Sequence, residues 1–77
     1  MYKIKEGYNL PFLQVTMIEG RPAEKKEQLI AELTSTVNKV LDAPYENIRV
    51  CINEVPANHW GIAGQSVQKR SEEQGKV

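Results

Sequence analysis

The residues of this chain that could do chemistry are few, and their types suit a small organic anion. They are Pro11, Arg21, Arg49 and Trp60. A guanidinium offers a planar fork of N–H donors that matches a carboxylate, so Arg21 and Arg49 could together bind a small anionic compound. Trp60 lies in a segment rich in proline and glycine, where its indole could form the apolar wall of a pocket.

Each of these residues also has an ordinary structural interpretation. Arg49 could be a solvated strand residue paired with Glu19 or Glu54, and Arg21 a surface charge at the entry to a helix. A tryptophan in a loop is most often a cover over the core or part of an interface. Taken singly, these residues do not decide between a binding site and a plain surface.

Other reactive side chains are scarce. The chain has one histidine, His59, and one cysteine, Cys51. His59 has no partner at a readable spacing and is interpreted as an exposed loop residue, while Cys51 on a strand is interpreted as a small buried hydrophobe. Because no Ser/His/Asp arrangement, phosphate loop or metal-ligand spacing is visible, we expect no metal, no other cofactor and no disulfide within the chain.

The composition narrows the class of protein. Seventy-seven residues make one domain, and ten basic side chains balance ten acidic ones. This balance argues against a nucleic-acid binder and against a polybasic membrane surface. The sequence contains no recognisable signal peptide and no apolar run long enough to span a bilayer, so we expect a soluble cytoplasmic protein.

The elements that must position these residues are predicted by hydrophobic periodicity. Residues 11–18 alternate as a strand, with Leu13, Val15 and Met17 on one face. Residues 48–53 alternate as a second strand, with Arg49 on the face opposite Val50. Between the strands, from Ala23 to Leu41, helical spacing predicts one amphipathic helix. Its buried stripe is predicted to consist of Leu29, Ile30, Leu33, Val37, Val40 and Leu41.

Strand, helix and strand in this order predict a βαβ unit with parallel strands, an α/β (α+β) fold. A small hairpin is expected within residues 56–67, and residues 68–77 form a charged tail without periodicity that we expect to be mobile or laid across a partner. The predicted organisation is an extension over 1–10, a domain over 11–67 and this tail. A chain so short buries only about 60 to 65% of its unfolded surface, and two strands leave open edges, so we expect an oligomer.

The ordered set of motifs carries more information than any single residue. The segment "PFLQVTMIEGRPAEKKEQLIAELTSTVNKVL", followed by "DAPYENIRVCINEVPANHWGIAGQSV", resembles the 4-oxalocrotonate tautomerase family, also called 2-hydroxymuconate tautomerases. The resemblance runs from Pro11 to about Val67. It includes "EGR" at the end of the first strand, "APYENIRVCINEV" around the second and "HWGIAG" in the hairpin.

This resemblance implies a small β-α-β subunit, paired into a four-stranded sheet, with three such dimers forming a hexamer. It also implies that an N-terminal proline acts as general base on a small anionic enol or keto acid, a role that falls on Pro11. Arg49 would then polarise the 2-hydroxy or 2-oxo group and its carboxylate, and Arg21 of a neighbouring subunit would hold the distal carboxylate. Trp60 stands where the best-known members carry Phe, which changes pocket volume and polarity.

Physical chemistry agrees with such a mechanism. An α-amine has an unperturbed pKa of about 7.7 to 8.0, and a secondary amine is intrinsically more basic. Two nearby arginine charges and an apolar wall disfavour the protonated amine and lower its pKa toward neutrality, where a general base works best. The same cations stabilise the dienolate charge that develops when a proton leaves carbon.

The first ten residues conflict with this mechanism as long as they are retained. Bonded to Leu10, the nitrogen of Pro11 is a tertiary amide without useful basicity. We favour initiation at codon 10, since TTG and CTG encode leucine internally but can start translation in bacteria, and residues 5–7 can be encoded by a ribosome-binding sequence. Proteolytic removal is a second interpretation. A retained extension, whose "YKIK" could cover a sheet edge, is the third.

The sequence therefore predicts an isomerase that moves a proton in a 1,3 or 1,5 sense on a compound such as 2-hydroxymuconate, as in degradation of aromatic compounds. With residues 1–10 retained, the alternative is a non-catalytic oligomer of the same fold. A third hypothesis is hydration or dehalogenation of a small unsaturated acid, for which Glu54 is the candidate to activate water.

Overall fold

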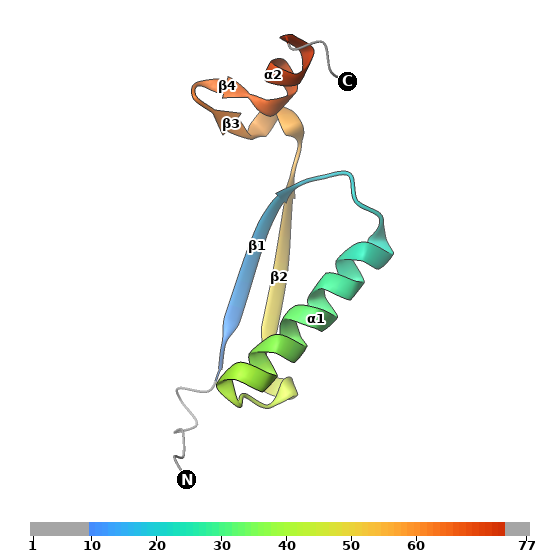
Figure 1. Cartoon of the computed structure of the whole chain (residues 1–77), viewed down its shortest axis with the longest axis vertical. Coiled ribbons are helices and arrows are strands. Elements are labelled where there is room, and N and C mark those ends of the chain that lie inside the picture. Colours follow the sequence, from blue (N-terminus) through green and yellow to red (C-terminus); the bar gives the residue numbers. More distant parts are fainter. Residues whose placement is uncertain (1–9, 74–77) are drawn as a thin grey trace. The chain divides into compact units, whose positions relative to one another are not determined.

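The computed structural model describes residues 10–73. Predictions on residues 2–5 and 74–77 lie outside this range. The described residues form two compact units, one made of 10–15 and 21–52 and the other of 16–20 and 53–73. The elements, labelled in Figure 1, are β1 (Phe12–Ile18), α1 (Ala23–Leu41), the 3-10 turn η2 (Tyr45–Asn47), β2 (Arg49–Val55), the 3-10 turn η3 (Ala57–His59), β3 (Gly61–Ile62), β4 (Gln65–Ser66) and α2 (Val67–Glu73).

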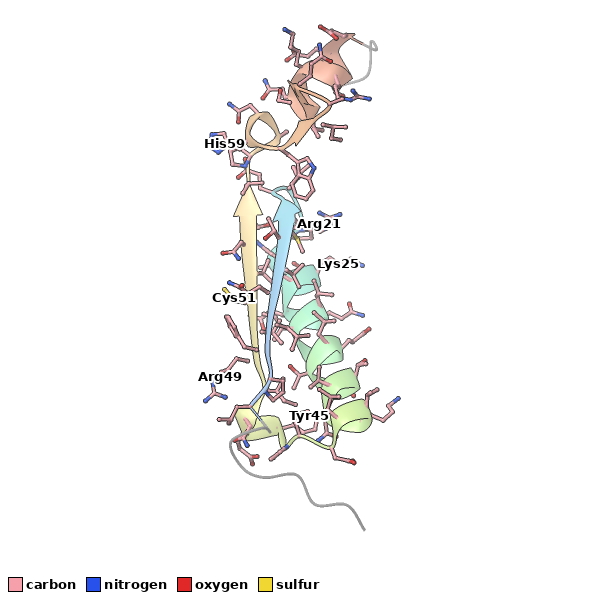
Figure 2. All side chains as sticks on the ribbon, turned by 90° about the vertical axis from the view of Figure 1, so that its left-hand side faces the viewer. Arg21, Lys25, Tyr45, Arg49, Cys51 and His59 are labelled. Atoms are coloured by element: carbon pink, nitrogen blue, oxygen red, sulfur yellow. The ribbon has the colours of Figure 1, made fainter. Side chains whose placement is uncertain are left out.

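The strands β1 and β2 form a two-stranded parallel sheet, as predicted. At its start the Arg49 N–H donates to the Pro11 carbonyl at 3.1 Å, and at its end the Glu19 N–H donates to the Val55 carbonyl at 2.8 Å. Residue numbers rise together along both strands, and the two arrows point the same way in Figure 2. The helix α1 connects the strands, which confirms the β-α-β order.

One face of this sheet is covered and the other is open. Leu13, Val15 and Met17 are half-buried, whereas the residues between them are exposed, which confirms the predicted alternation. Within the first unit, Leu13 and Val50 pack against a small core made of Val37, Ala43 and Ile48.

The helix α1 has the predicted bounds, but its buried stripe is narrower than predicted. Leu29, Leu33 and Val37 turn inward, whereas Val40 is 67% exposed and Leu41 49% exposed. Ile30 is also exposed, so the prediction was wrong for these three residues. Val40 follows Leu33 by seven residues, about two helical turns, and lies on the same side of the helix. Its exposure therefore reflects the small surface that one chain offers to cover the helix, not the orientation of the helix.

The second unit contains the predicted hairpin. The strands β3 and β4 pair antiparallel, with Gly61 opposite Ser66 and Ile62 opposite Gln65. The two turn residues have positive φ, 52° at Ala63 and 86° at Gly64, as a two-residue hairpin turn of type I′ requires. Ala63 occupies a backbone region that favours glycine or asparagine.

Residues 68–73 of the predicted charged tail are helical and, together with Val67, form α2, a helix that was not predicted. The Ser66 hydroxyl accepts from the Lys69 N–H at 3.1 Å at the helix start, and the Gln65 amide donates to the Glu73 carboxylate at 3.2 Å. The half-buried side of α2 consists of Val67, Arg70 and Ser71. Because that side is mostly polar, hydrophobic periodicity could not reveal it. No helix among residues 10–73 has the length and apolar character needed to cross a membrane.

Candidate active site

Pro11 and Arg49 lie side by side at the start of the strand pair. The Arg49 N–H donates to the Pro11 carbonyl at 3.1 Å, which sets the two residues on adjacent strands. Pro11 is half-buried, and Leu10 before it is 58% exposed. Proline has no backbone N–H to donate, but no hydrogen bond between the strands is lost here, because Pro11 pairs with Arg49 through its carbonyl. The structure thus brings together two of the four predicted site residues.

The guanidinium of Arg49 is oriented by the turn that precedes its own strand. Its Nη1 donates to the Glu46 carbonyl at 2.5 Å, and Glu46 is the middle residue of η2. In Figure 2 the side chains of Arg49 and Cys51 project from β2 on the side away from α1. Arg49 is exposed, and so is Phe12 on β1, at 60%. The open face of the sheet therefore carries both a cation and an exposed apolar side chain.

Arg21 lies at the opposite end of the first unit from Pro11 and Arg49. It precedes the first turn of α1, whereas η2 and Arg49 follow the last turn. Nineteen helical residues span about 28 Å. Figure 2 shows the two labelled arginines at the two ends of α1. Arg21 and Pro11 of one chain are therefore too far apart to bind one small molecule.

Trp60 belongs to the second unit, where both its backbone N–H and its carbonyl are hydrogen-bonded. Its N–H donates to the Ala57 carbonyl at 3.4 Å, and its carbonyl accepts from the Val67 N–H at 2.7 Å. Its side chain is half-buried. His59, one residue earlier, is exposed at the end of η3, which agrees with its interpretation as a loop residue.

Cys51 is half-buried on β2, less than the burial predicted for it. Glu54, the candidate for water activation, is exposed and lies in the second unit. Within residues 10–73, no group of three or more His, Cys, Asp or Glu side chains is arranged to hold a metal ion.

The connector between α1 and β2, residues 42–48, overlaps the motif "APYENIRVCINEV", but the motif did not reveal what the connector contributes to this site. It supplies the Glu46 carbonyl that accepts from Arg49. The one residue that marks the connector in the sequence is Pro44, which ends the helical pattern. It is extended, with φ −64°, and precedes η2. The hydrogen bonds of the connector are made mostly by the backbone, and side-chain identity does not reveal them.

Comparison with known proteins identifies relatives of this chain. The family model described as "Tautomerase enzyme" matches residues 11–70. A probable tautomerase of Ralstonia nicotianae is 54% identical over 55 residues, which are 71% of this chain and 79% of that protein. A 2-hydroxymuconate tautomerase of Pseudomonas putida is 45% identical over 60 residues, 78% of this chain and 95% of that protein.

Solved structures agree with these relatives. A heterohexamer 4-oxalocrotonate tautomerase from Chloroflexus aurantiacus is 36% identical, with a TM-score of 0.72, and the match covers 75% of this chain and 94% of that one. The likeness in backbone and in sequence extends over nearly the whole length of that relative. It confirms the fold and the resemblance read from the sequence.

Proposed function

The chain belongs to the tautomerase family, and we propose that it catalyses keto–enol tautomerisation of a small 2-hydroxy-dienoate or 2-oxo acid such as 2-hydroxymuconate. The observation that carries this proposal is the pairing of Pro11 with Arg49 through the Arg49 N–H. That bond sets the candidate base and the candidate cation on neighbouring strands. The cytoplasm and the degradation of aromatic compounds are proposed as the setting.

In the proposed reaction the nitrogen of Pro11 moves one proton. As a free secondary amine it takes the proton of the 2-hydroxyl group, and the electrons of that O–H bond form the C=O bond of the keto acid. The displaced π electrons then accept the proton from the prolinium at carbon 3 or carbon 5, which corresponds to the 1,3 or the 1,5 sense. Arg49 stabilises the oxygen charge that develops in between.

Binding of the substrate is proposed to need two subunits. Arg49 of one subunit holds the 2-oxo group and its carboxylate, and Arg21 of a neighbour holds the distal carboxylate. The separation of about 28 Å along α1 supports a contribution from a neighbour, because one chain cannot supply both arginines. Trp60 is proposed as the apolar wall.

Assembly into an oligomer, and more specifically into a hexamer of three dimers, is part of the proposal. Phe12 on the open sheet face is 60% exposed, and Val40 on α1 is 67% exposed. Exposed apolar side chains such as these could form part of a surface that a partner covers. The heterohexamer from Chloroflexus aurantiacus supports the hexamer.

The active form is proposed to begin at Pro11. While Leu10 is attached, the proline nitrogen is an amide and cannot accept a proton under ordinary conditions. Leu10 is 58% exposed, so a peptide bond beside it would be accessible to a protease if initiation at codon 10 were not used. A chain that retains residues 1–10 would be the non-catalytic oligomer.

One comparison tests the function. A chain starting Met–Pro11, from which cells remove the methionine, is compared with the full 77-residue chain by intact mass and by the ultraviolet absorbance of 2-hydroxymuconate. We expect rapid tautomerisation only when the mass begins at Pro11. Pro11→Ala in the short chain, which keeps a primary amine, should reduce kcat strongly. Equal activity of the short and full chains would refute Pro11 as the base.

A further inference from the structure

The connector that carries Glu46 is closed by consecutive hydrogen bonds. The Asp42 N–H donates to the Asn38 carbonyl at 3.0 Å, the Asn47 N–H to the Pro44 carbonyl at 3.0 Å, and the Ile48 N–H to the Tyr45 carbonyl at 3.1 Å. The next bond along the chain is the one between Arg49 and Pro11. Backbone hydrogen bonds therefore recur along the short connector from the last turn of α1 to the candidate catalytic pair.

Besides Arg49 itself, the side chain of Asn38 also bonds to the connector. Asn38, half-buried in the last turn of α1, donates from Nδ2 to the Ala43 carbonyl at 2.8 Å. Ala43 is 0% exposed and belongs to the core with Val37 and Ile48. A buried carbonyl that loses its donor is left unsatisfied, so the connector would have to change its path to hydrate that oxygen.

The Ala43 carbonyl belongs to the peptide that joins Ala43 to Pro44. Holding this peptide sets the direction in which the chain enters η2, because the proline ring fixes φ of Pro44, which is −64°. Two residues later the Glu46 carbonyl accepts from Arg49 Nη1. The orientation of the guanidinium thus depends on the peptide that Asn38 holds.

We propose that Asn38 is a positioning residue for Arg49, acting through the Ala43 carbonyl and η2. The inference rests on the proposed function for its effect on turnover, whereas the hydrogen-bond linkage can be tested without any substrate. Asn38 is separated from the substrate by the connector, so it changes where Arg49 points and leaves the charge of the site unaltered. A small displacement of a catalytic group is enough to lower a rate by one or two orders of magnitude.

The test uses three variants of the chain that begins at Pro11. Asn38→Leu removes the donor at similar volume, and Asn38→Asp removes it while keeping a polar group. Thr34→Val is the matched control, because the Thr34 hydroxyl likewise donates to a backbone carbonyl, but to that of Ile30 within α1, at 2.8 Å. All three are first checked by circular dichroism and by assembly size.

Two measurements are made on each variant. In both Asn38 variants we expect kcat on 2-hydroxymuconate to fall about tenfold with KM within about twofold, since Arg49 still binds but is misaligned in the transition state. We also expect the Ile48 and Arg49 backbone N–H groups to exchange with solvent about tenfold faster, and the Arg49 Nε–H resonance to shift. Thr34→Val should change none of these.

The outcomes separate this inference from the proposed function. An inactive wild-type chain refutes the proposed function, while hydrogen exchange and the Arg49 resonance still test the linkage. An active wild type whose Asn38 variants keep kcat refutes the positioning role. Loss of activity in Asn38→Leu but not in Asn38→Asp would assign the effect to packing and also overturn the proposal. Unchanged exchange and an unchanged Arg49 resonance in both variants would overturn the linkage.

Discussion

The two faces of the β1–β2 sheet in the first unit serve different purposes. The covered face buries Leu13 and Val50 against Val37, Ala43 and Ile48. The open face presents Arg49 and Phe12, both exposed. The covered face provides the stability available to one chain, and the open face carries the proposed chemistry together with an apolar surface that a partner would cover. A substitution on the covered face should therefore lower the stability of the fold, and one on the open face should lower turnover.

Arg49→Gln on the open face should give the largest effect. We expect kcat of the chain beginning at Pro11 to fall by about 100-fold to 1,000-fold, the range for removal of one donor that stabilises a developing oxyanion. The free energy of unfolding should change by less than about 0.5 kcal/mol, because the side chain is exposed. Steady-state kinetics and thermal unfolding measure the two quantities. Kinetics equal to wild type would remove Arg49 from the site.

Ile48→Ala on the covered face should do the reverse. Ile48 is 8% exposed, and its truncation leaves a cavity in a small core, so we expect a loss of about 2 to 3 kcal/mol in the free energy of unfolding. Ile48→Val is the control and should cost about 1 kcal/mol. Because Ile48 also belongs to the connector that precedes Arg49, kcat at a temperature where the variants remain folded should fall by less than the factor of about ten expected for the Asn38 variants. A fall in kcat as large as that of Arg49→Gln would show that the two faces are not separable.

Arg21→Gln should raise KM about tenfold with kcat within about twofold, because Arg21 is proposed to hold the distal carboxylate and not the reacting oxygen. Mixing its subunits with Arg49→Gln subunits, by unfolding and refolding together, creates sites in which both arginines are intact. The mixture should be more active than either parent. Activity equal to the average of the parents would contradict a site shared between subunits.

The smallest effect is expected from Ala63→Asn in the hairpin of the second unit. Ala63 has φ 52°, which asparagine adopts more readily than alanine, so the variant should be more stable by about 0.5 to 1 kcal/mol. Gly64→Ala, at φ 86°, should be destabilised in turn. Chemical denaturation measures both. Neither change lies on the two faces, so kcat should follow wild type.

Hydrophobic periodicity and turn residues predicted those features of the fold that depend on residues close together in the sequence. The alternation of Leu13, Val15 and Met17, the bounds of α1 and the hairpin were all readable, because each follows from spacing or from turn residues within a few positions. The sequence did not predict which apolar residues of α1 stay exposed. Val40 shares a side with Leu33, and an apolar pattern is the same whether its cover comes from the same chain or from another.

In the candidate site, too, the sequence indicated some residues and only the structure showed the contacts of others. The resemblance pointed to Pro11 and Arg49, and the structure adds how their backbones pair. The roles of Glu46 and Asn38 could not be read from the sequence, because Glu46 contributes a backbone carbonyl that any residue possesses, and Asn38 binds a carbonyl five residues away. Hydrogen bonds of this kind depend on the path of the connector and not on a motif.

The bond between the Arg49 N–H and the Pro11 carbonyl has a consequence for regulation. Folding uses the carbonyl of Pro11, whereas the proposed catalysis uses its nitrogen. A chain that retains the extension over residues 1–10 would therefore keep the carbonyl that pairs its strands, and we expect it to enter the same oligomer as an inactive member. The proportion of trimmed subunits would then set the activity of each particle in graded steps, without any subunit having to refold.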